Sequence, residues 1–140
     1  MYVSNTRRAS YRSPRGFTLV ELMVTVVIVA ILLGIAVPSY SLYMKQSRRG
    51  ETESALMDIA QREQTYLLDQ RAYAVGAGAL ATLNTTLPAD VNAYYTVTIN
   101  PGATAVSFIA TAAPKAGTAQ AGDPTLTIDN TGAKTPTNVW

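Results

Sequence analysis

The stretch SPRGFTLVELMVTVVIVAILLGIAVPSY, residues 13–40, decides the fold of this chain. From Leu22 to Val37 it holds no charged residue. Counted as helix from Phe17, this apolar run has about 21 residues and is roughly 31 Å long, close to the hydrocarbon thickness of a bilayer. One carboxylate, Glu21, lies near its start. The run therefore predicts a membrane-spanning helix, with a charge near one end that a simple membrane span does not explain.

The charges are distributed unevenly around this run. All charges before Gly16 are arginines (Arg7, Arg8, Arg12 and Arg15), whereas the remainder from Phe17 holds seven basic and nine acidic residues and is near −2. A basic segment on one side of an apolar helix predicts a cytoplasmic N-terminus and an exported C-terminal part. Since the excess of positive charge belongs to the N-terminal segment, it does not argue for nucleic-acid binding.

Two ordinary explanations of the N-terminus fall short. A secretory signal has its apolar core before a small-residue cleavage site, whereas here the apolar run follows Gly16. A plain signal anchor explains the topology, but it explains neither Glu21 nor the abrupt boundary at Gly16 and Phe17.

The segment Arg15-Gly16-Phe17-Thr18-Leu19-Val20-Glu21, followed by the apolar run, resembles the class III signal of type IV pilins and related pseudopilins. The resemblance implies cleavage by prepilin peptidase between Gly16 and Phe17, followed by N-methylation of Phe17. It also implies that Glu21 pairs with the new N-terminal amine of a neighbouring subunit during assembly. Two buried charges need such a partner. A glutamate that reaches the cytoplasmic headgroups, or that pairs within its own chain before assembly, is an alternative.

Four segments follow from this interpretation: a leader at 1–16 that is removed, a membrane and assembly helix at 17–38, its periplasmic continuation at 39–73, and a head of loop and sheet at 74–140. Pro38 ends the strictly apolar run and predicts a helix kink, which Gly34 would ease. The resemblance implies a helix that loosens just before this proline in assembled fibres. A simple kink at the membrane exit is the other possibility.

The periplasmic continuation shows helical periodicity, with Glu63 at the edge of its apolar stripe. Lys45, Arg48 and Arg49 form a basic cluster. We expect it to be a solvated face with local ion pairs to Glu51 and Glu53, with a headgroup contact or a salt bridge to a neighbour as alternatives. Residues 43–74 resemble the corresponding helix of PilE-like minor pilins of Gram-negative bacteria. The stripe consists of Ala55, Leu56, Ile59, Ala60, Tyr66 and Leu67.

The head is expected to be a loop at 74–92 followed by strands. Apolar residues alternate with polar ones at 93–100 and 104–112, which predicts a hairpin closed by a turn at 100–103. A flexible connection at 114–124, a third strand at 125–129, a turn at 130–132 and a short fourth strand at 134–135 complete it. The expected fold class is α+β: a long N-terminal helix packed on an antiparallel sheet of three or four strands, as in the type IV pilin fold.

The C-terminal segment from Gly122 departs from the family pattern. PilE-like minor pilins commonly close this segment with a disulfide, and one of its cysteines usually stands where this chain has Val139; the chain contains no cysteine. We therefore expect Trp140 to hold the tail by packing into the head, with an exposed adhesive tryptophan as the alternative.

Other chemistries find little support in the sequence. The chain has no histidine and no cysteine, so the usual neutral-pH general base and the thiolate nucleophile are missing, and we do not expect an enzyme or a cofactor. Asp123, Asp129 and Asn130 supply few oxygens for a Ca²⁺ loop, and we expect no metal. Lys115 and Lys134 are too few for a basic stripe on the head, so we do not expect a nucleic-acid partner.

The sequence thus predicts a minor pilin of a type IV pilus that supports pilus assembly, adhesion and twitching motility. A major pilin or a type II secretion pseudopilin is the close alternative, and a DNA- or surface-binding module at the pilus tip is the alternative of another class. The expected partners are other pilin subunits, prepilin peptidase and the inner-membrane assembly platform. The chain would lie in the inner membrane before assembly and in the extracellular pilus afterwards.

Overall fold

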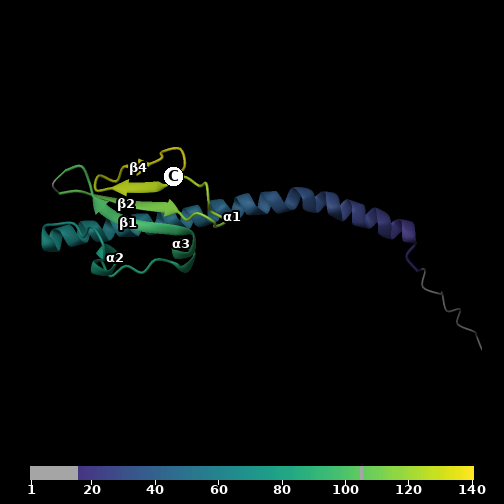
Figure 1. Cartoon of the computed structure of the whole chain (residues 1–140), viewed down its shortest axis with the longest axis horizontal. Coiled ribbons are helices and arrows are strands. Elements are labelled where there is room, and N and C mark those ends of the chain that lie inside the picture. Colours follow the sequence, from purple (N-terminus) through teal and green to yellow (C-terminus); the bar gives the residue numbers. More distant parts are fainter. Residues whose placement is uncertain (1–15, 105) are drawn as a thin grey trace, which may run out of the picture. The chain divides into compact units, whose positions relative to one another are not determined.

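A computed structural model describes residues 16–104 and 106–140. Its first element is the helix α1 (Leu19–Gln70), which stays helical through Pro38 and Gly50. The chain divides into two compact units, Met1–Ser39 and Tyr40–Trp140. Figure 1 shows the N-terminal part of α1 in purple and blue and the strands in green and yellow.

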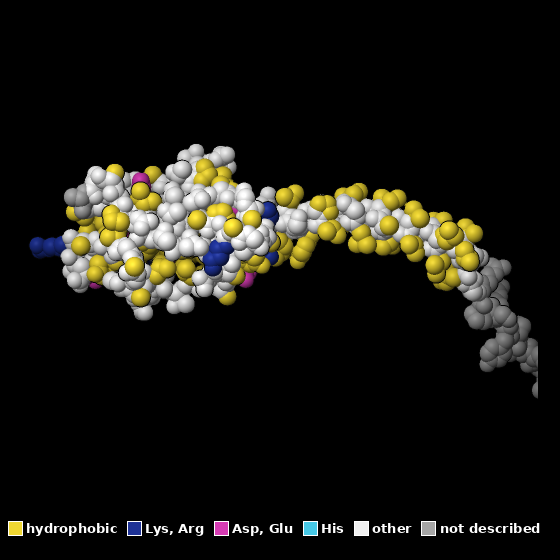
Figure 2. All heavy atoms as spheres, viewed as in Figure 1, with side chains coloured by type: hydrophobic (Ala, Val, Ile, Leu, Met, Phe, Trp, Pro, Cys, Tyr) yellow, Lys and Arg dark blue, Asp and Glu magenta, His cyan; other side chains and the backbone are white. Residues whose placement is uncertain are grey.

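The first unit is an apolar helix whose side chains are exposed. Every large apolar residue from Leu19 to Val37 is at least 47% exposed, and yellow spheres cover this segment in Figure 2. Among the described residues, α1 is the one helix long and apolar enough to cross a membrane, and no part of its most apolar stretch is buried in the chain. Apolar surface of this extent indicates a segment that is covered by lipid or by another protein.

The second unit, Tyr40–Trp140, which we call the head, contains the second part of α1 (the head helix, from Tyr40 to Gln70) and a four-stranded antiparallel sheet in the order β1-β2-β3-β4. Its strands are β1 (Tyr95–Pro101), β2 (Phe108–Pro114), β3 (Leu126–Asp129) and β4 (Lys134–Thr135). The expected number of three or four strands, their antiparallel order and the turn at 130–132 are confirmed. The predicted first strand begins two residues too early, because Ala93 and Tyr94 belong to a helix.

The core of this unit lies between the second half of α1 and one face of the sheet. Leu56 and Ile59 of α1 are fully buried, as are Phe108 and Leu126 of the sheet. The alternation expected in this strand is present in β1, since Tyr95 and Ile99 are buried and the threonines between them are exposed. Most of the predicted stripe on α1 also packs on this core: Ala55, Ala60 and Tyr66 are partly buried against it.

Two predictions about the connections were wrong. The stretch 74–92, expected to be a loop, contains α2 (Ala79–Thr82) and continues into α3 (Ala89–Tyr94). These helices have four and six residues and lack a side-chain N-cap bond, so they carry little of the sequence signal that marks a helix. The hairpin turn is also longer than predicted: β2 begins only at Phe108, and Val106 lies exposed before it.

The longer hairpin turn is closed by Ser107. The Gly102 N–H donates to the Ser107 carbonyl at 3.1 Å, while the Ser107 hydroxyl donates to the Thr104 carbonyl at 2.8 Å. A Cβ atom added at Gly102 would lie 2.5 Å from the Ser107 Oγ, so this position needs glycine for a close approach.

The tail packs at the margin of the core. Trp140 and Val139 are partly buried against the core cluster. The indole N–H of Trp140 donates to the Thr135 carbonyl at 3.2 Å, and the Lys134 ammonium lies 4.6 Å from the ring centroid. The expected packing of Trp140 into the head is therefore present at the edge of the core.

Candidate functional site

The first candidate site is the start of α1, where Thr18 caps the helix. The Glu21 N–H donates to the Thr18 hydroxyl oxygen at 3.2 Å, and Glu21 is the acidic residue of the first turn. A threonine followed three residues later by glutamate is the capping-box pattern. The segment Thr18-Leu19-Val20-Glu21 thus has a local role that sequence reasoning missed, although the pattern was visible in it.

Glu21 also has an electrostatic role at this end of the helix. The first turn of a helix carries about half a positive charge from its unpaired N–H groups. A cationic amine at Phe17 would add to it, while the carboxylate of Glu21 offsets both. Phe17 is 82% exposed and Glu21 is exposed as well, so both are accessible to another molecule.

Gly16, Phe17, Glu21 and Pro38 are all within the described residues, whereas residues 1–15 are not. Gly16 and Phe17 lie just before the helix, in non-helical backbone. Near Pro38, the Ser39 hydroxyl donates to the Ile35 carbonyl at 3.0 Å. Cleavage after Gly16, methylation of Phe17, the assembly contact of Glu21 and a kink at Pro38 stay predictions.

The basic cluster of α1 belongs to the head, and the expected ion pairs with Glu51 and Glu53 are wrong. Among the described residues, Arg49 forms its salt bridge with Asp123. Lys45 Nζ donates to the Ala121 carbonyl at 3.5 Å. The guanidinium of Arg48 lies 4.0 Å from the centroid of the Tyr94 ring, a cation–π contact.

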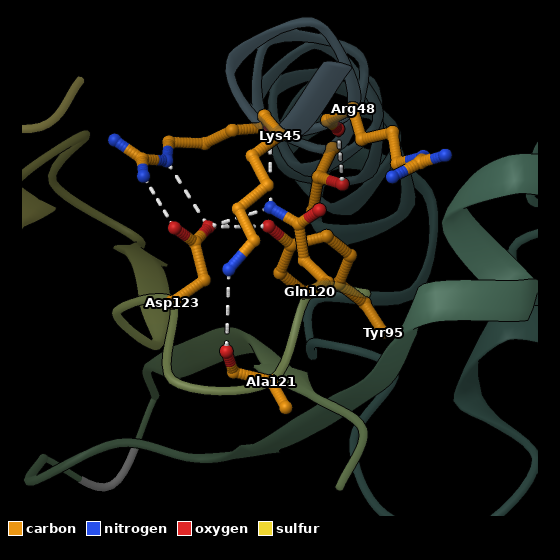
Figure 3. A network of polar contacts seen from close by, with 8 residues as sticks. Lys45, Arg48, Tyr95, Gln120, Ala121 and Asp123 are labelled. Carbon is orange, nitrogen blue, oxygen red and sulfur yellow. Dashed lines mark hydrogen bonds and ion pairs between the residues drawn. The ribbon is translucent and has the colours of Figure 1, made fainter. Parts of the chain in front are cut away.

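Asp123 is the centre of a polar network, shown in Figure 3, that joins the start of the head helix to the loop before β3. Its carboxylate accepts two hydrogen bonds from Arg49, one from the Tyr95 hydroxyl at 2.7 Å and one from the Gln120 amide at 2.9 Å. The Gln120 amide also donates to the Lys45 carbonyl at 3.1 Å. We call Lys45, Arg49, Tyr95, Gln120, Ala121 and Asp123 the Asp123 network.

The network changes how its members titrate. Burial would raise the pKa of Asp123, but the hydrogen bonds from Arg49, Tyr95 and Gln120 outweigh it and hold the pKa below the usual 3.8. Burial, with the hydrogen bond to Asp123, raises the pKa of Tyr95. The carboxylate is thus fixed in its charged form at neutral pH, and a paired, hydrogen-bonded charge of this kind is strongly destabilising to break.

The loop 114–124 was predicted to be flexible, and the structure corrects this. Gln120 is fully buried and the Asp123 side chain is only 5% exposed. Their hydrogen bonds hold the loop against α1 and β1. No local sequence pattern marks this contact, because Arg49 and Asp123 are 74 residues apart. The network thus attaches this loop noncovalently to α1 and β1.

Glu63 is the second feature that the sequence placed wrongly. It was expected at the edge of the apolar stripe, yet it is fully buried. One carboxylate oxygen accepts the Ala74 N–H at 2.9 Å, and the other has no hydrogen-bond partner. Burial raises its pKa, and the Ala74 N–H offsets this only in part. The buried row Thr52, Leu56, Ile59 and Glu63 follows helical spacing, so the pattern contained the signal.

The acidic residues considered for a metal have other partners. Asp129 Oδ1 accepts hydrogen bonds from the Thr131 N–H, the Thr131 hydroxyl and the Ala133 N–H, which forms the turn after β3. These bonds, led by the one from the Thr131 hydroxyl, lower the pKa of Asp129. Asp123 is occupied by its network. No group of three or more acidic side chains able to hold a metal occurs in the described part of the chain.

Comparison with known proteins gives two family matches that together cover residues 11–127. The family described as type IV minor pilin ComP, DNA uptake sequence receptor, matches residues 38–127. The prokaryotic N-terminal methylation motif matches residues 11–37. The first match covers most of the head and the second covers the GFTLVE boundary with the apolar run.

Individual relatives agree with these matches. The type IV wide pilus major component PilA4 of Thermus thermophilus is 30% identical over 81 residues, 57% of this chain and 62% of that protein. The type II secretion system core protein G of Dickeya chrysanthemi is 36% identical over 87 residues, 58% of this chain and 55% of that protein. The chain thus spans less than two thirds of the length of these relatives.

A solved structure shares the fold. The type IV pilin from Shewanella oneidensis superposes with a TM-score of 0.51 at 27% identity, over 69% of this chain and 97% of that structure.

Proposed function

The chain belongs to the type IV pilin family, with a head of the minor pilin ComP type, and we propose that it is a minor structural subunit of a type IV pilus. The family and fold expected from the sequence are thereby confirmed. The family and the fold are those of structural proteins, and the function that we propose is assembly rather than catalysis. The observation that carries it is the apolar segment of α1, which is exposed along its whole length and lies within the match to the N-terminal methylation motif.

The proposed processing follows from the order of the segments. Prepilin peptidase would cut between Gly16 and Phe17 while the leader arginines remain in the cytoplasm and α1 spans the inner membrane. Phe17 would then be methylated at its new amine. The platform in the inner membrane would extract the subunit into the pilus, where neighbouring helices cover the apolar segment that lipid covered before. Adhesion and twitching motility would follow from the pilus as a whole.

The proposed role of Glu21 is to receive the Phe17 amine of a neighbouring subunit as it joins the fibre. In an apolar filament core both charges would be desolvated, so each stabilises the other only if they meet. The exposed Glu21 at the capped helix start supports this assignment, since its carboxylate is accessible to a second chain.

The test is incorporation into sheared fibres, measured by immunoblot of fibre and membrane fractions. Glu21→Gln keeps the shape and removes the charge, so we expect normal cleavage, normal membrane content and strongly reduced incorporation. Asp58→Asn, a charge removal on the exposed surface of the head, is the matched control. Normal incorporation of Glu21→Gln would refute the assembly role.

Minor rather than major status is tested by stoichiometry. A minor subunit should be scarce relative to the main pilin in the same sheared fibres. A chain that forms the bulk of the fibre would instead be a major pilin, and one found only with secretion-channel components would be a pseudopilin.

A second candidate function is DNA binding by the head, which the sequence alone did not favour. The family description of a DNA uptake sequence receptor supports it, together with a basic and aromatic patch around Tyr94. Arg48 lies over the ring, Lys115 N–H donates to the Tyr94 carbonyl at 2.8 Å, and Lys115 Nζ donates to the Asn92 carbonyl at 2.5 Å. Within the described residues, neither cation has a salt bridge, so their charges remain available to phosphate.

The net charge of the head argues for weak binding at most. From Tyr40 onward the chain holds seven basic and eight acidic residues, so any attraction to DNA must come from the local patch. The test is duplex binding by the full chain in a neutral detergent at two salt concentrations. Lys115→Gln should weaken binding, whereas Arg71→Gln, at the other end of the head helix, should not. No binding at physiological salt would reject this function.

A further inference from the structure

Two tyrosines at the start of the head helix do not pack on the hydrophobic core. Tyr40 is 66% exposed and Tyr43 is 68% exposed, and neither belongs to the residues packed on the core. They are three residues apart, so they lie on the same side of α1. Exposed tyrosines suit the boundary between an apolar layer and water, because the ring is apolar and the hydroxyl is polar.

The basic residues that follow contact other parts of the head. Arg49 forms a salt bridge with Asp123 and Lys45 donates to the Ala121 carbonyl, so both are bonded to the loop before β3. Arg48 lies over the Tyr94 ring and, among the described residues, has no salt bridge. The tyrosines are the last exposed amphipathic side chains between the apolar run and this bonded segment.

Their distance along the helix fits the membrane interface. Tyr40 and Tyr43 follow Val37 by three and six residues, which at the rise of a helix is roughly 4.5–9 Å. The headgroup layer beyond the hydrocarbon core is roughly 5–7 Å thick on each side. Tyrosine is enriched at this depth, where the ring meets acyl chains and the hydroxyl meets water and headgroups.

We propose that Tyr40 and Tyr43 form an interfacial anchor that binds the headgroup layer of the outer leaflet and sets the depth at which the inserted subunit rests before assembly. The proposal rests on the proposed membrane insertion. Lipid is the occupant we assign, because the pair directly continues a segment whose length matches the bilayer. The anchor fixes how far the head stands from the membrane surface.

The test measures depth by spin labelling in lipid nanodiscs of phosphatidylethanolamine and phosphatidylglycerol. The chain has no cysteine, so single cysteines introduce labels without background. Leu42→Cys reports the interface, Val29→Cys the bilayer interior and Leu68→Cys, where the leucine is 82% exposed, the aqueous head. The access of each label to oxygen and to a water-soluble nickel complex gives its depth.

We expect the label at position 42 to lie in the headgroup layer. Replacing both tyrosines by serine should move this label toward water by about 3 Å, the rise of two helical residues, whereas replacing both by tryptophan should leave its depth unchanged. A label at 42 that is fully aqueous, or whose depth is the same in the serine variant, overturns the anchor. If the label at 29 is aqueous, membrane insertion itself fails and the proposed function fails with it.

Discussion

The residues of α1 from Leu19 to Val37 and those from Thr52 to Glu63 are parts of one helix with opposite surroundings. In the first segment every large apolar side chain is exposed, whereas the second buries Thr52, Leu56, Ile59 and Glu63 completely. The first contains apolar residues on all sides and one carboxylate, and the second contains one apolar stripe among polar residues. A helix that is apolar all round needs partners on all sides, while a striped helix needs only one sheet. The first segment therefore depends on lipid or other subunits, and the second is satisfied within the chain.

Cutting the chain between the two segments should have the largest effect. A fragment from Tyr40 to Trp140 keeps every residue of the buried core, so we expect a soluble monomer with a cooperative thermal transition. The chain from Phe17 onward should remain in the detergent or lipid fraction, because its apolar segment is intact. Sedimentation and calorimetry measure both. A fragment that aggregates or melts without cooperativity would mean that the head depends on the first segment.

The next largest effect is expected from the core of the head. Phe108 is fully buried and its ring lies 4.9 Å from that of Tyr73 in an edge-to-face contact. Phe108→Ala should reduce the free energy of unfolding of the head by about 3–5 kcal/mol, as large-to-small core substitutions do. Ile109→Ala, at the next position on the opposite sheet face, should reduce it by about 1 kcal/mol or less. Equal effects in urea unfolding would contradict the assigned faces of β2.

The ion pair of Asp123 with Arg49 is largely buried, so breaking it should reduce stability more than breaking an exposed ion pair does. Asp123→Asn leaves the charge of Arg49 without its partner, and we expect a loss of about 2–3 kcal/mol at pH 7. The matched control is Asp58→Asn, because Asp58 and Arg62 form an exposed pair at 2.8 Å worth about 0.3–0.5 kcal/mol.

The same variant has a defined pH dependence. Since the pKa of Asp123 is lowered on folding, the advantage of the wild type is present above the unfolded value of 3.8 and is lost as the pH falls through the folded value. An advantage that persists unchanged well below this value would show that the charge of Asp123 is not what stabilises the head.

Whether a feature could be predicted from the sequence depends on how far apart in the chain the contacting residues lie. The apolar run and the alternating pattern around Val97 are local features, and local periodicity predicted them. The short strand at Lys134 and Thr135 is expected from its place just after the turn at 130–132. The partner of Arg49 could not be predicted in this way. Glu51 and Glu53 are its neighbours in sequence, while Asp123 reaches it only once the sheet has formed.

The burial of Glu63 was not predicted either, although Glu63 does follow a local pattern. It lies in one helical row with the other buried residues of α1. Glutamate is almost never fully buried unless it is paired, so its spacing with Thr52, Leu56 and Ile59 does not by itself predict its burial. A backbone N–H supplied by the loop at Ala74 makes the burial tolerable, and no local pattern announces such a donor. The two short helices were missed because they have too few residues to show a period.

The smallest expected effect tests whether the second segment is fully satisfied within the chain. Because one oxygen of Glu63 has no hydrogen-bond partner and burial raises its pKa, its ionised form should be poorly stabilised. A raised folded pKa gives stability that is present below the unfolded value of 4.5 and is lost as the pH rises through the folded value. Wild-type stability relative to Glu63→Gln should thus decrease from pH 4 to pH 7, by about 1 kcal/mol or less. Urea midpoints of the two proteins across this range measure the difference. A stability difference that does not change with pH would mean that the carboxylate of Glu63 is as well stabilised in the folded head as in the unfolded chain. The buried segment of α1 would then be fully satisfied within the chain, and its contrast with the exposed apolar segment would be greater.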